Sequence, residues 1–290
     1  MSNDISFPIS SCTPQDVNNL ITEIPEPPHR LYVRGTLPKQ NTKYLAVVGS
    51  RNYSDYAVQT IDYLIGGLAG YHISIISGLA IGVDTLAHRT ALNARLHTIA
   101  VPGSGIHDSV IYPSRNKALA RTILENGGAL VSEFEPTFRA TQWSFPKRNR
   151  IMAGLSHATL LIEASEKSGT LITARLATDF NRELLVVPGN IFSDNSKGLH
   201  QFLKLGAVPI TTPQDIVDTL QLEKSSNKES VSTLLSERER LVCDILSEPK
   251  DQDEIIRSLP FNQSEAVALL MQMELTGIIA ERNGIYHKII

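Results

Sequence analysis

The side chains best suited to bind an anion lie within residues 142–177. A dense cationic run, Lys147, Arg148 and Arg150, opens this stretch, and a small-residue turn, Ser168-Gly169-Thr170, precedes a helical pattern near its end. A helix that begins at such a turn presents backbone N–H groups and the positive end of its dipole. Cations beside a helix N-terminus predict a site for phosphate groups.

Two aromatic residues, Trp143 and Phe145, flank the cationic run. Cations follow the phosphates of a single strand of nucleic acid, and an aromatic face offers a surface on which a base can stack. The alternative is a solvated basic surface. The turn at 168–170 also has a plainer interpretation, N-capping by its hydroxyl groups, and both interpretations can hold because the cap and the anion site coincide.

A second small-residue turn, Gly49-Ser50-Arg51, follows the apolar run 44–49. A guanidinium group at such a turn can bind a phosphate with two hydrogen bonds, although it could also face solvent. The pattern is not G-x-G-x-x-G, so a dinucleotide site is weakly supported. Asp84 and His88 are four residues apart on a predicted helix and could form an acid–base pair, but no nucleophile accompanies them and a structural role is favoured.

The elements that must position these residues are apolar strands alternating with helical patterns. This alternation predicts an α/β fold, an extended Rossmann-like, doubly wound and mostly parallel sheet with helices on both faces. Ligands of such sheets bind at the carboxyl ends of the strands, where the turns described above should meet. The predicted strands are residues 31–35, 44–49, 73–78, 129–134, 158–163 and 183–190, together with the first part of 97–105, which continues as a loop.

The domain organisation is predicted from changes in composition. Residues 1–27 are polar and contain prolines, which indicates a flexible arm; 28–222 form the Rossmann-like domain, and the Ser-rich stretch 223–235 is a linker. Residues 236–290 show three short helices and an Asn-Gly hairpin, which predicts a winged helix. This part has six Lys/Arg and ten Asp/Glu, hence a net charge of −4, and is a poor polyanion binder.

Composition bounds the remaining possibilities. The 290 residues are 42% hydrophobic, and the net charge of −3 means that nucleic-acid binding requires a local patch. No apolar run approaches the roughly 18 residues of a membrane span, and the N-terminus has no secretory pattern. Cys12 and Cys243 are far apart, which favours a reducing cytoplasm over a disulfide. No metal-ligand spacing is present, and we expect no metal or cofactor.

Eight motifs occur in an order that resembles the DNA-processing protein A (DprA/Smf) family, over about residues 28–210. The resemblance implies an extended Rossmann-like fold that binds single-stranded DNA and dimerises. It also implies that the protein is not an enzyme, but protects incoming DNA and loads the RecA recombinase during natural transformation. The motifs are VGSR, SGLAIGVDTLAH, YPSRN, SEF, FPKRNRIMAGLS, EASEKSGTLITARLA, VPGN and GLHQFLKLGA.

The resemblance also implies roles for particular residues. The helical segment 198–207 matches the family's dimer contacts, with His200 and Leu203 at the interface, although core packing is an alternative for it. The acidic winged helix fits a protein contact better than DNA. The implied DNA-binding residues are Gly49, Ser50, Arg51, Phe145, Lys147, Asn149, Arg150, Ser168, Gly169 and Thr170.

Two rival functions remain. The same Rossmann branch resembles the phosphoribohydrolases that activate cytokinins, in which a Gly-Gly-x-Gly-Thr turn is followed by a catalytic Glu. Here Leu171, Ile172 and Thr173 follow the turn, so no carboxylate is available there to stabilise an oxocarbenium ion. A DNA-regulatory protein acting through the winged helix is disfavoured by that domain's charge.

Overall fold

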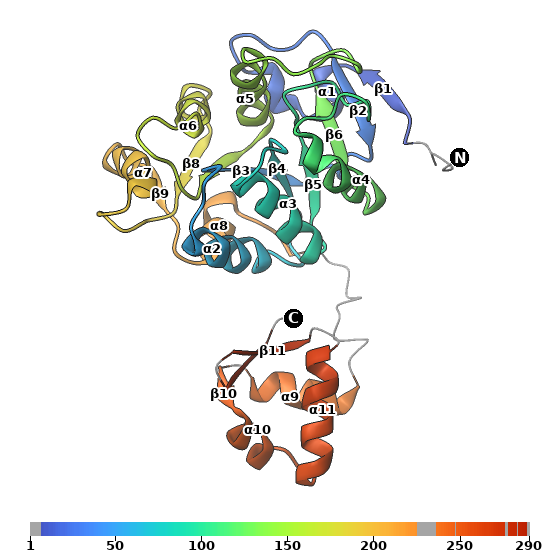
Figure 1. Cartoon of the computed structure of the whole chain (residues 1–290), viewed down its shortest axis with the longest axis vertical. Helices are drawn as coiled ribbons and strands as arrows, with labels where there is room; N and C mark the ends of the chain where they lie inside the picture. The colour runs from blue at the N-terminus through green and yellow to red at the C-terminus, as the bar shows by residue number, and fades with distance from the viewer. Residues whose placement is uncertain (1–6, 225–235, 247, 276–277, 283, 289–290) are drawn as a thin grey trace. The chain divides into compact units, whose positions relative to one another are not determined.

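The computed structural model describes residues 7–224, 236–246, 248–275, 278–282 and 284–288. The chain divides into two compact units, Met1–Lys224 and Ser225–Ile290, each of which is considered by itself (Figure 1). Among the helices of the described residues, none is long and apolar enough to span a bilayer.

In the described part of the first unit, nine strands form one sheet. Neighbouring strands from β6 to β9 run parallel, and β2 and β1 extend the sheet antiparallel beyond β6. The mostly parallel α/β sheet predicted from the sequence is therefore confirmed. In spatial order the strands are β1 (Ile9–Cys12), β2 (Leu31–Gly35), β6 (Ala129–Ser132), β5 (His97–Ala100), β4 (Ile73–Ser77), β3 (Lys43–Val48), β7 (Ala158–Leu161), β8 (Glu183–Val186) and β9 (Val208–Pro209).

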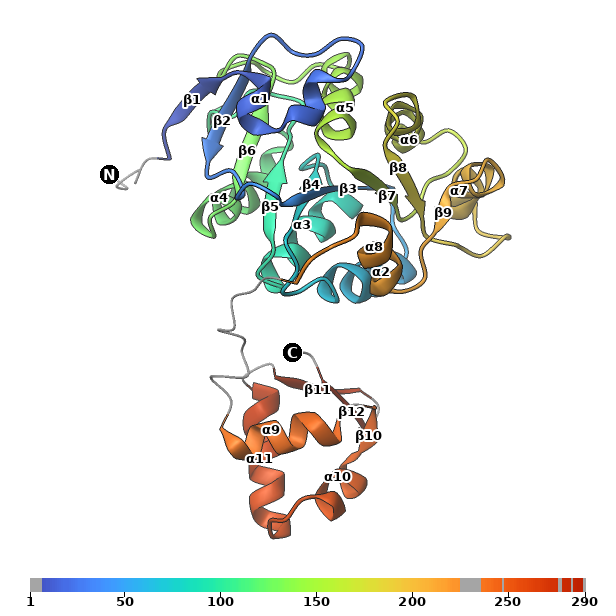
Figure 2. The ribbon, with the colours of Figure 1, turned by 180° about the vertical axis from the view of Figure 1, so that it is seen from behind.

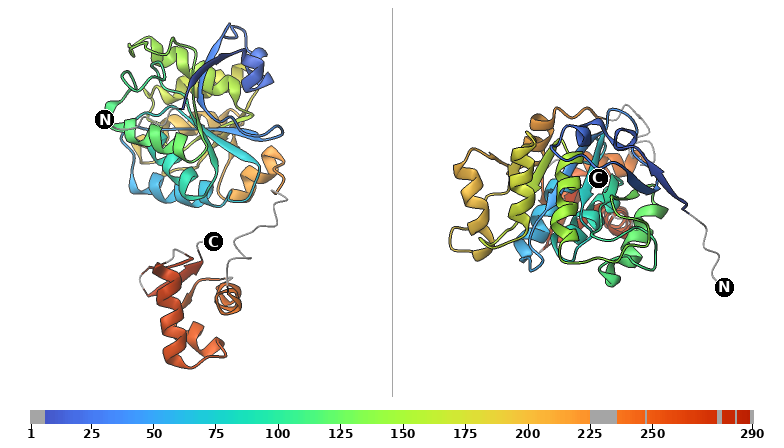
Figure 3. Two further views of the ribbon diagram at one scale, coloured as in Figure 1. Left: turned by 90° about the vertical axis from the view of Figure 1, so that its right-hand side faces the viewer. Right: turned by 90° about the horizontal axis from the view of Figure 1, so that it is seen from above.

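Helices cover both faces of this sheet (Figures 1 and 3). Successive residues of β3 alternate between the two cores: Val48 packs with the α5 side and Val47 with the α2 side, as expected for a strand buried on both faces. One face carries α1 (Pro14–Val17), η1 (Asn19–Thr22), α5 (Ser144–Leu155), α6 (Thr170–Asp179) and α7 (Asp194–Lys204). The other carries α2 (Asp55–Gly66), α3 (Val83–Asn93), η2 (Ser114–Asn116), α4 (Lys117–Glu125) and α8 (Pro213–Leu220).

The chain reverses its direction of travel across the sheet between β3 and β7. From β3 it proceeds through β4 and β5 to β6, whereas from β7 it proceeds the opposite way through β8 to β9. Loops that leave the carboxyl ends of β3 and β7 therefore diverge, and a crevice opens between them. The turns at 49–51 and 168–170 begin at this point.

The prediction of a flexible arm is wrong for residues 7–27. β1 pairs with β2, and Val17, Ile21 and Ile24 are buried in the core beside α5 (Figure 2). A Cβ on Gly154 of α5 would lie 2.7 Å from Ile21 Cδ1, so the two segments are in close contact. Val17, Ile21 and Ile24 do have the four- and three-residue spacing of one helix face, but the stretch is short and lies between prolines, which favoured the interpretation as a loose arm.

The second unit has the elements predicted for a winged helix. Val242, Ile255, Leu270 and Met273 form its core. Gly284 of the predicted hairpin turn has φ +82°, whereas residue 283 and most of the predicted linker, 225–235, lie outside the described residues. The elements are α9 (Glu237–Ile245), α10 (Gln252–Ser258), α11 (Gln263–Leu275), β10 (Lys250–Asp251), β11 (Ile279–Arg282) and β12 (Ile285–Lys288), with strand order β10-β12-β11.

Candidate functional site

A pocket of about 510 Å³ lies at the carboxyl ends of β3 and β7. Four chain segments form it: the turn after β3, the segment that opens α3, one face of α5, and the turn and first residues of α6. The structure thus brings together eight of the ten residues expected to bind DNA, namely Gly49, Ser50, Arg51, Phe145, Asn149, Ser168, Gly169 and Thr170.

Hydrogen bonds join the two turns of the pocket. Thr170 Oγ1 donates to Gly49 O at 3.0 Å, and Ser168 Oγ accepts from Thr170 N at 3.2 Å. The N–H groups of Leu171 and Ile172 donate to the carbonyls of Ser168 and Gly169. Several backbone N–H groups of the first turn of α6 are therefore already hydrogen-bonded within the chain. The attraction of this turn for an anion comes mainly from the helix dipole rather than from free N–H groups.

Arg51 is exposed at the rim of this pocket, and its position is fixed through the backbone. Val83 N donates to Ser50 O at 3.1 Å. Gly82 has φ +91°, and a Cβ there would lie 2.4 Å from Ser50 O. The Arg51 guanidinium carbon lies 5.8 Å from the centroid of the Phe145 ring. A guanidinium donor and an aromatic face are therefore held side by side.

Arg148, the middle cation of the run, forms the floor of the pocket and is only 6% exposed. Its Nη1 donates to the carbonyls of Gly78 and Val101. Burial lowers the pKa of this guanidinium to about 10, so it stays charged at neutral pH, and the nearby Asp84 carboxylate favours the charge. Asp84 accepts from Gly78 N at 3.1 Å; burial raises the pKa of its carboxyl, and the Arg148 charge opposes that rise.

Lys147 and Arg150 do not line the pocket. Arg150, which was expected to contact a phosphate, is paired with Glu133 and donates to Glu26 O, so its guanidinium is engaged within the chain. Lys147 is partly exposed, with Nζ 3.7 Å from Glu133 and 5.9 Å from the Trp143 ring centroid.

Helix periodicity explains this division of α5. Phe145, Asn149 and Met152 are spaced four and three residues apart and share the face that lines the pocket. Lys147 and Arg150 are three apart and share the face toward Glu133. The spacing was visible in the sequence and could have separated the two groups.

A buried carboxylate beside the pocket was missed by sequence reasoning. Glu163 follows β7 and accepts from Ser54 N at 3.0 Å, Ser54 Oγ at 2.5 Å and Asn195 Nδ2 at 3.2 Å. Asn195 also donates to Asn52 O at 3.0 Å. Glu163 thereby holds the starts of α2 and α7 against the end of β7. A Glu that directly follows an apolar strand was the available signal.

His88 has a structural environment. It is fully buried, and its Nδ1 lies 2.8 Å from Thr98 Oγ1. Because Thr98 Oγ1 donates to Ile75 O, the His88 proton resides on Nδ1. Burial lowers the pKa of His88 to about 3, so the ring is neutral at pH 7. These features agree with the structural role favoured for it over acid–base chemistry.

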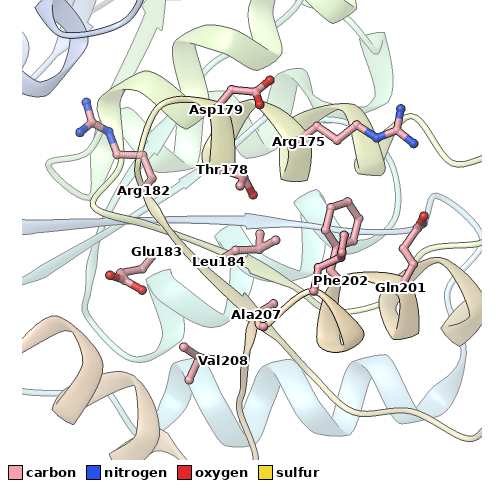
Figure 4. Close-up of a pocket in the computed structure, with 12 residues that line it drawn as sticks. Arg175, Thr178, Asp179, Arg182, Glu183, Leu184, Gln201, Phe202, Ala207 and Val208 are labelled. Carbon is pink, nitrogen blue, oxygen red and sulfur yellow. The ribbon is translucent and has the colours of Figure 1, made fainter.

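The expected dimer residues lie on α7. His200 Nε2 is 3.0 Å from Gly189 O, and Leu203 packs partly against the core. Leu205, which caps α7 and was not expected, is 81% exposed. A hollow of about 400 Å³ lies beside these residues. Figure 4 shows side chains that line it, among them Leu184, Phe202 and, along α6, Arg175.

A model of the family described as DNA recombination-mediator protein A matches residues 9–221. The chain belongs to this family. The membership expected from the order of the motifs is therefore confirmed, and the matched region coincides with the unit that contains the pocket.

Other members of the DNA recombination-mediator protein A family align over most of their length. Protein Smf of Escherichia coli is 36% identical over 268 residues, which cover 89% of this chain and 71% of that protein. DNA processing protein DprA of Streptococcus pneumoniae is 36% identical over 209 residues, 72% and 71% of the two chains.

Two solved structures share the fold. The DprA structure from Streptococcus pneumoniae has a TM-score of 0.68 at 35% identity, covering 74% of this chain and 75% of that one. DNA processing protein A from Helicobacter pylori, described for its unique single-stranded DNA binding mode, has a TM-score of 0.64 at 28% identity, with 74% and 96% covered.

Proposed function

We propose that this chain is a non-enzymatic mediator that binds single-stranded DNA in the pocket between β3 and β7. The observation that carries the proposal is the placement of Arg51, an exposed guanidinium held by backbone contacts, 5.8 Å from the Phe145 ring. One group suits a phosphate and the other an unstacked base, and both are available together only on a single strand. The single-stranded DNA binding of the Helicobacter pylori relative supports the same assignment.

Fluorescence anisotropy with labelled single-stranded and duplex oligonucleotides tests this proposal. We expect preference for the single strand, and Arg51→Ala should weaken it about 10- to 100-fold, because hydrogen bonds to a charged group contribute roughly 1.5–3 kcal/mol. Arg95→Gln is the matched control, since Arg95 is an exposed arginine at the amino end of β5, away from the pocket. Equal affinity of the two arginine variants would contradict the assignment.

The dependence of binding on salt provides a second measure. Each phosphate contact on a single strand contributes a slope of about −0.7 to log K against log salt. Arg148 and Arg150 of the cationic run are bound internally, so Lys147 of that run and Arg51 of the first turn remain to contact phosphates. A short oligonucleotide should give a slope near −1.4, rather than the value near −3 expected if four cations contacted phosphates.

The same proposal includes a homodimer formed through α7. The exposed Leu205 and the partly buried Leu203 support this face, whereas His200 is directed toward Gly189 O within its own chain. Two pockets in one dimer would share a strand and gain avidity. Light scattering at micromolar concentration should give twice the chain mass, and Leu205→Glu should give the monomer. A monomeric wild type would remove this part of the proposal.

We further propose that the bound strand is protected and passed to the RecA recombinase during natural transformation, in the cytoplasm. Family membership supports a role in recombination. Assembly of RecA filaments on strands coated with single-strand-binding protein should be faster with this protein, and Arg51→Ala should lose the acceleration. An unchanged assembly rate with the wild type would exclude RecA loading.

The rival function is a nucleotide phosphoribohydrolase. Leu171, Ile172 and Thr173 supply no carboxylate after the turn, and Asp84, the carboxylate that lines the pocket, is held by backbone N–H groups beside Arg148. Incubation with nucleoside monophosphates should therefore release no base. Release of free base that Arg51→Ala abolishes would favour the enzyme.

A further inference from the structure

The aromatic surface does not end at Phe145. The Tyr112 ring, in the loop between β5 and α4, has its centroid 5.6 Å from that of Phe145, and Tyr112 is 50% exposed. Trp143, at the start of α5, is 55% exposed and has edge contacts with Phe134, which follows β6. Exposed rings therefore occur beyond the pocket at the carboxyl ends of β5 and β6.

The order of the strands sets these rings in a row. The pocket lies over β7 and β3, Phe145 abuts Gly103 after β5, and Trp143 contacts the loop after β6. Since β3 and β6 are three strand spacings apart, the row extends about 14 Å from the pocket along one edge of the sheet.

The charged side chains along this edge also favour the binding of a polyanion. Three carboxylates of the same loops have internal partners: Asp108 pairs with Arg34, Glu133 with Arg150, and Glu135 accepts from Tyr32 Oη at 2.5 Å. Within residues 7–224, the side chains of Arg115, Lys117 and Arg139, which lie on these loops and at the start of α4, have no described ion pair or hydrogen bond with a side chain. Exposed cations thus remain next to exposed rings.

We propose that single-stranded DNA leaves the phosphate pocket along the carboxyl edge toward β6, and that Tyr112 and Trp143 are further base-stacking positions after Phe145. This inference rests on the proposed single-strand binding and specifies the path of the strand. The opposite direction ends at Phe192, which is 86% exposed but has no described ring or cation contact linking it to the pocket.

Trp143 is the only tryptophan of the chain, so its fluorescence reports directly on this path. Oligothymidines of increasing length, from about 4 to about 16 nucleotides, should first bind without changing the emission and then quench it once they are long enough to reach Trp143. Binding of all lengths with no quenching at saturation would overturn the proposed path.

Substitutions locate the second stacking position. Tyr112→Ala should weaken binding of long oligothymidines by about 5- to 100-fold, as expected when a stacking ring is removed, and leave the shortest unchanged. Tyr112→Phe keeps the ring and should bind like the wild type. Tyr63→Ala is the matched control, because Tyr63 is 56% exposed but lies in the second half of α2.

The outcomes separate the two proposals. A wild type that binds no oligothymidine of any length refutes the pocket itself. A wild type that binds, with Tyr112→Ala unchanged and Phe192→Ala weakened, leaves the pocket intact and reverses the direction of the strand. Thermal melts of each variant show whether a loss of binding reflects a loss of folding.

Discussion

The two arginines of the pocket should respond to substitution in opposite ways. Arg51 is exposed and its side chain supports no other part of the fold, so Arg51→Ala should change the free energy of unfolding by no more than about 0.5 kcal/mol while weakening DNA binding. Arg148→Met removes a buried charge, leaves the carbonyls of Gly78 and Val101 without their donor, and takes the compensating charge away from the buried Asp84 carboxylate.

The magnitude follows from the burial of that site. Arg148 and Asp84 are buried opposite charges; leaving one such charge uncompensated costs about 3–5 kcal/mol, and in a unit of this size each kcal/mol lowers Tm by roughly 2–4 °C. Arg148→Met should therefore melt roughly 6–20 °C below the wild type. Adding Asp84→Asn should recover part of the loss, because the uncompensated charge is then gone.

Thermal melts and anisotropy on the same preparations provide the assay. The expected result is a stable variant with weakened binding, Arg51→Ala, and an unstable variant, Arg148→Met. A wild-type melting temperature for Arg148→Met would refute the description of Arg148 as the structural floor of the pocket. A large destabilisation by Arg51→Ala would refute the description of Arg51 as a side chain that has no structural role and is available to bind phosphate.

Three further predictions concern stability. Gly82→Ala should destabilise the fold by at least about 1–2 kcal/mol and weaken binding, because φ is +91° there and a Cβ would meet Ser50 O; Gly66→Ala, where a Cβ meets nothing within 4 Å, should be harmless in urea denaturation. The pKa of His88 is about 3 in the folded chain and about 6.5 in the unfolded chain. The stability that depends on the neutral ring is therefore complete above pH 6.5 and is lost as the pH falls toward 3. Between pH 7 and pH 5 the wild type should lose about 2 kcal/mol more of its free energy of unfolding than His88→Gln does, as measured by denaturation at both pH values. Ile21→Ala should cost about 2–5 kcal/mol, whereas a loose N-terminal arm would predict no change.

Much of the fold followed from the sequence because strands buried on both faces read as continuous apolar runs. Residues 44–48 and 158–161 illustrate this, and the turns that follow them line the pocket as expected. The N-terminal segment was not predictable in this way, since its strand lies at the edge of the sheet and the helix spacing of its buried residues spans only about two turns between prolines.

The site was predicted in part, and the errors share one physical cause. Residue type identified Lys147, Arg148 and Arg150 as cations, but which of them reaches a ligand depends on carboxylates and carbonyls from distant segments, such as Glu133 and Gly78. Asn149 and Arg51 were correctly located at the pocket because each follows from local geometry, a helix face in one case and a strand-end turn in the other.

Glu163 has a consequence for how the two proposed interfaces communicate. One carboxylate joins the start of α7, through Asn195, to the end of β7 and to the first residues of α2 beside the pocket. A displacement of α7 by a second chain would therefore strain or break bonds beside the proposed DNA pocket, including the one from Asn195 to Asn52 O. By thermodynamic reciprocity, any factor by which DNA tightens the dimer is the factor by which dimerisation tightens DNA binding.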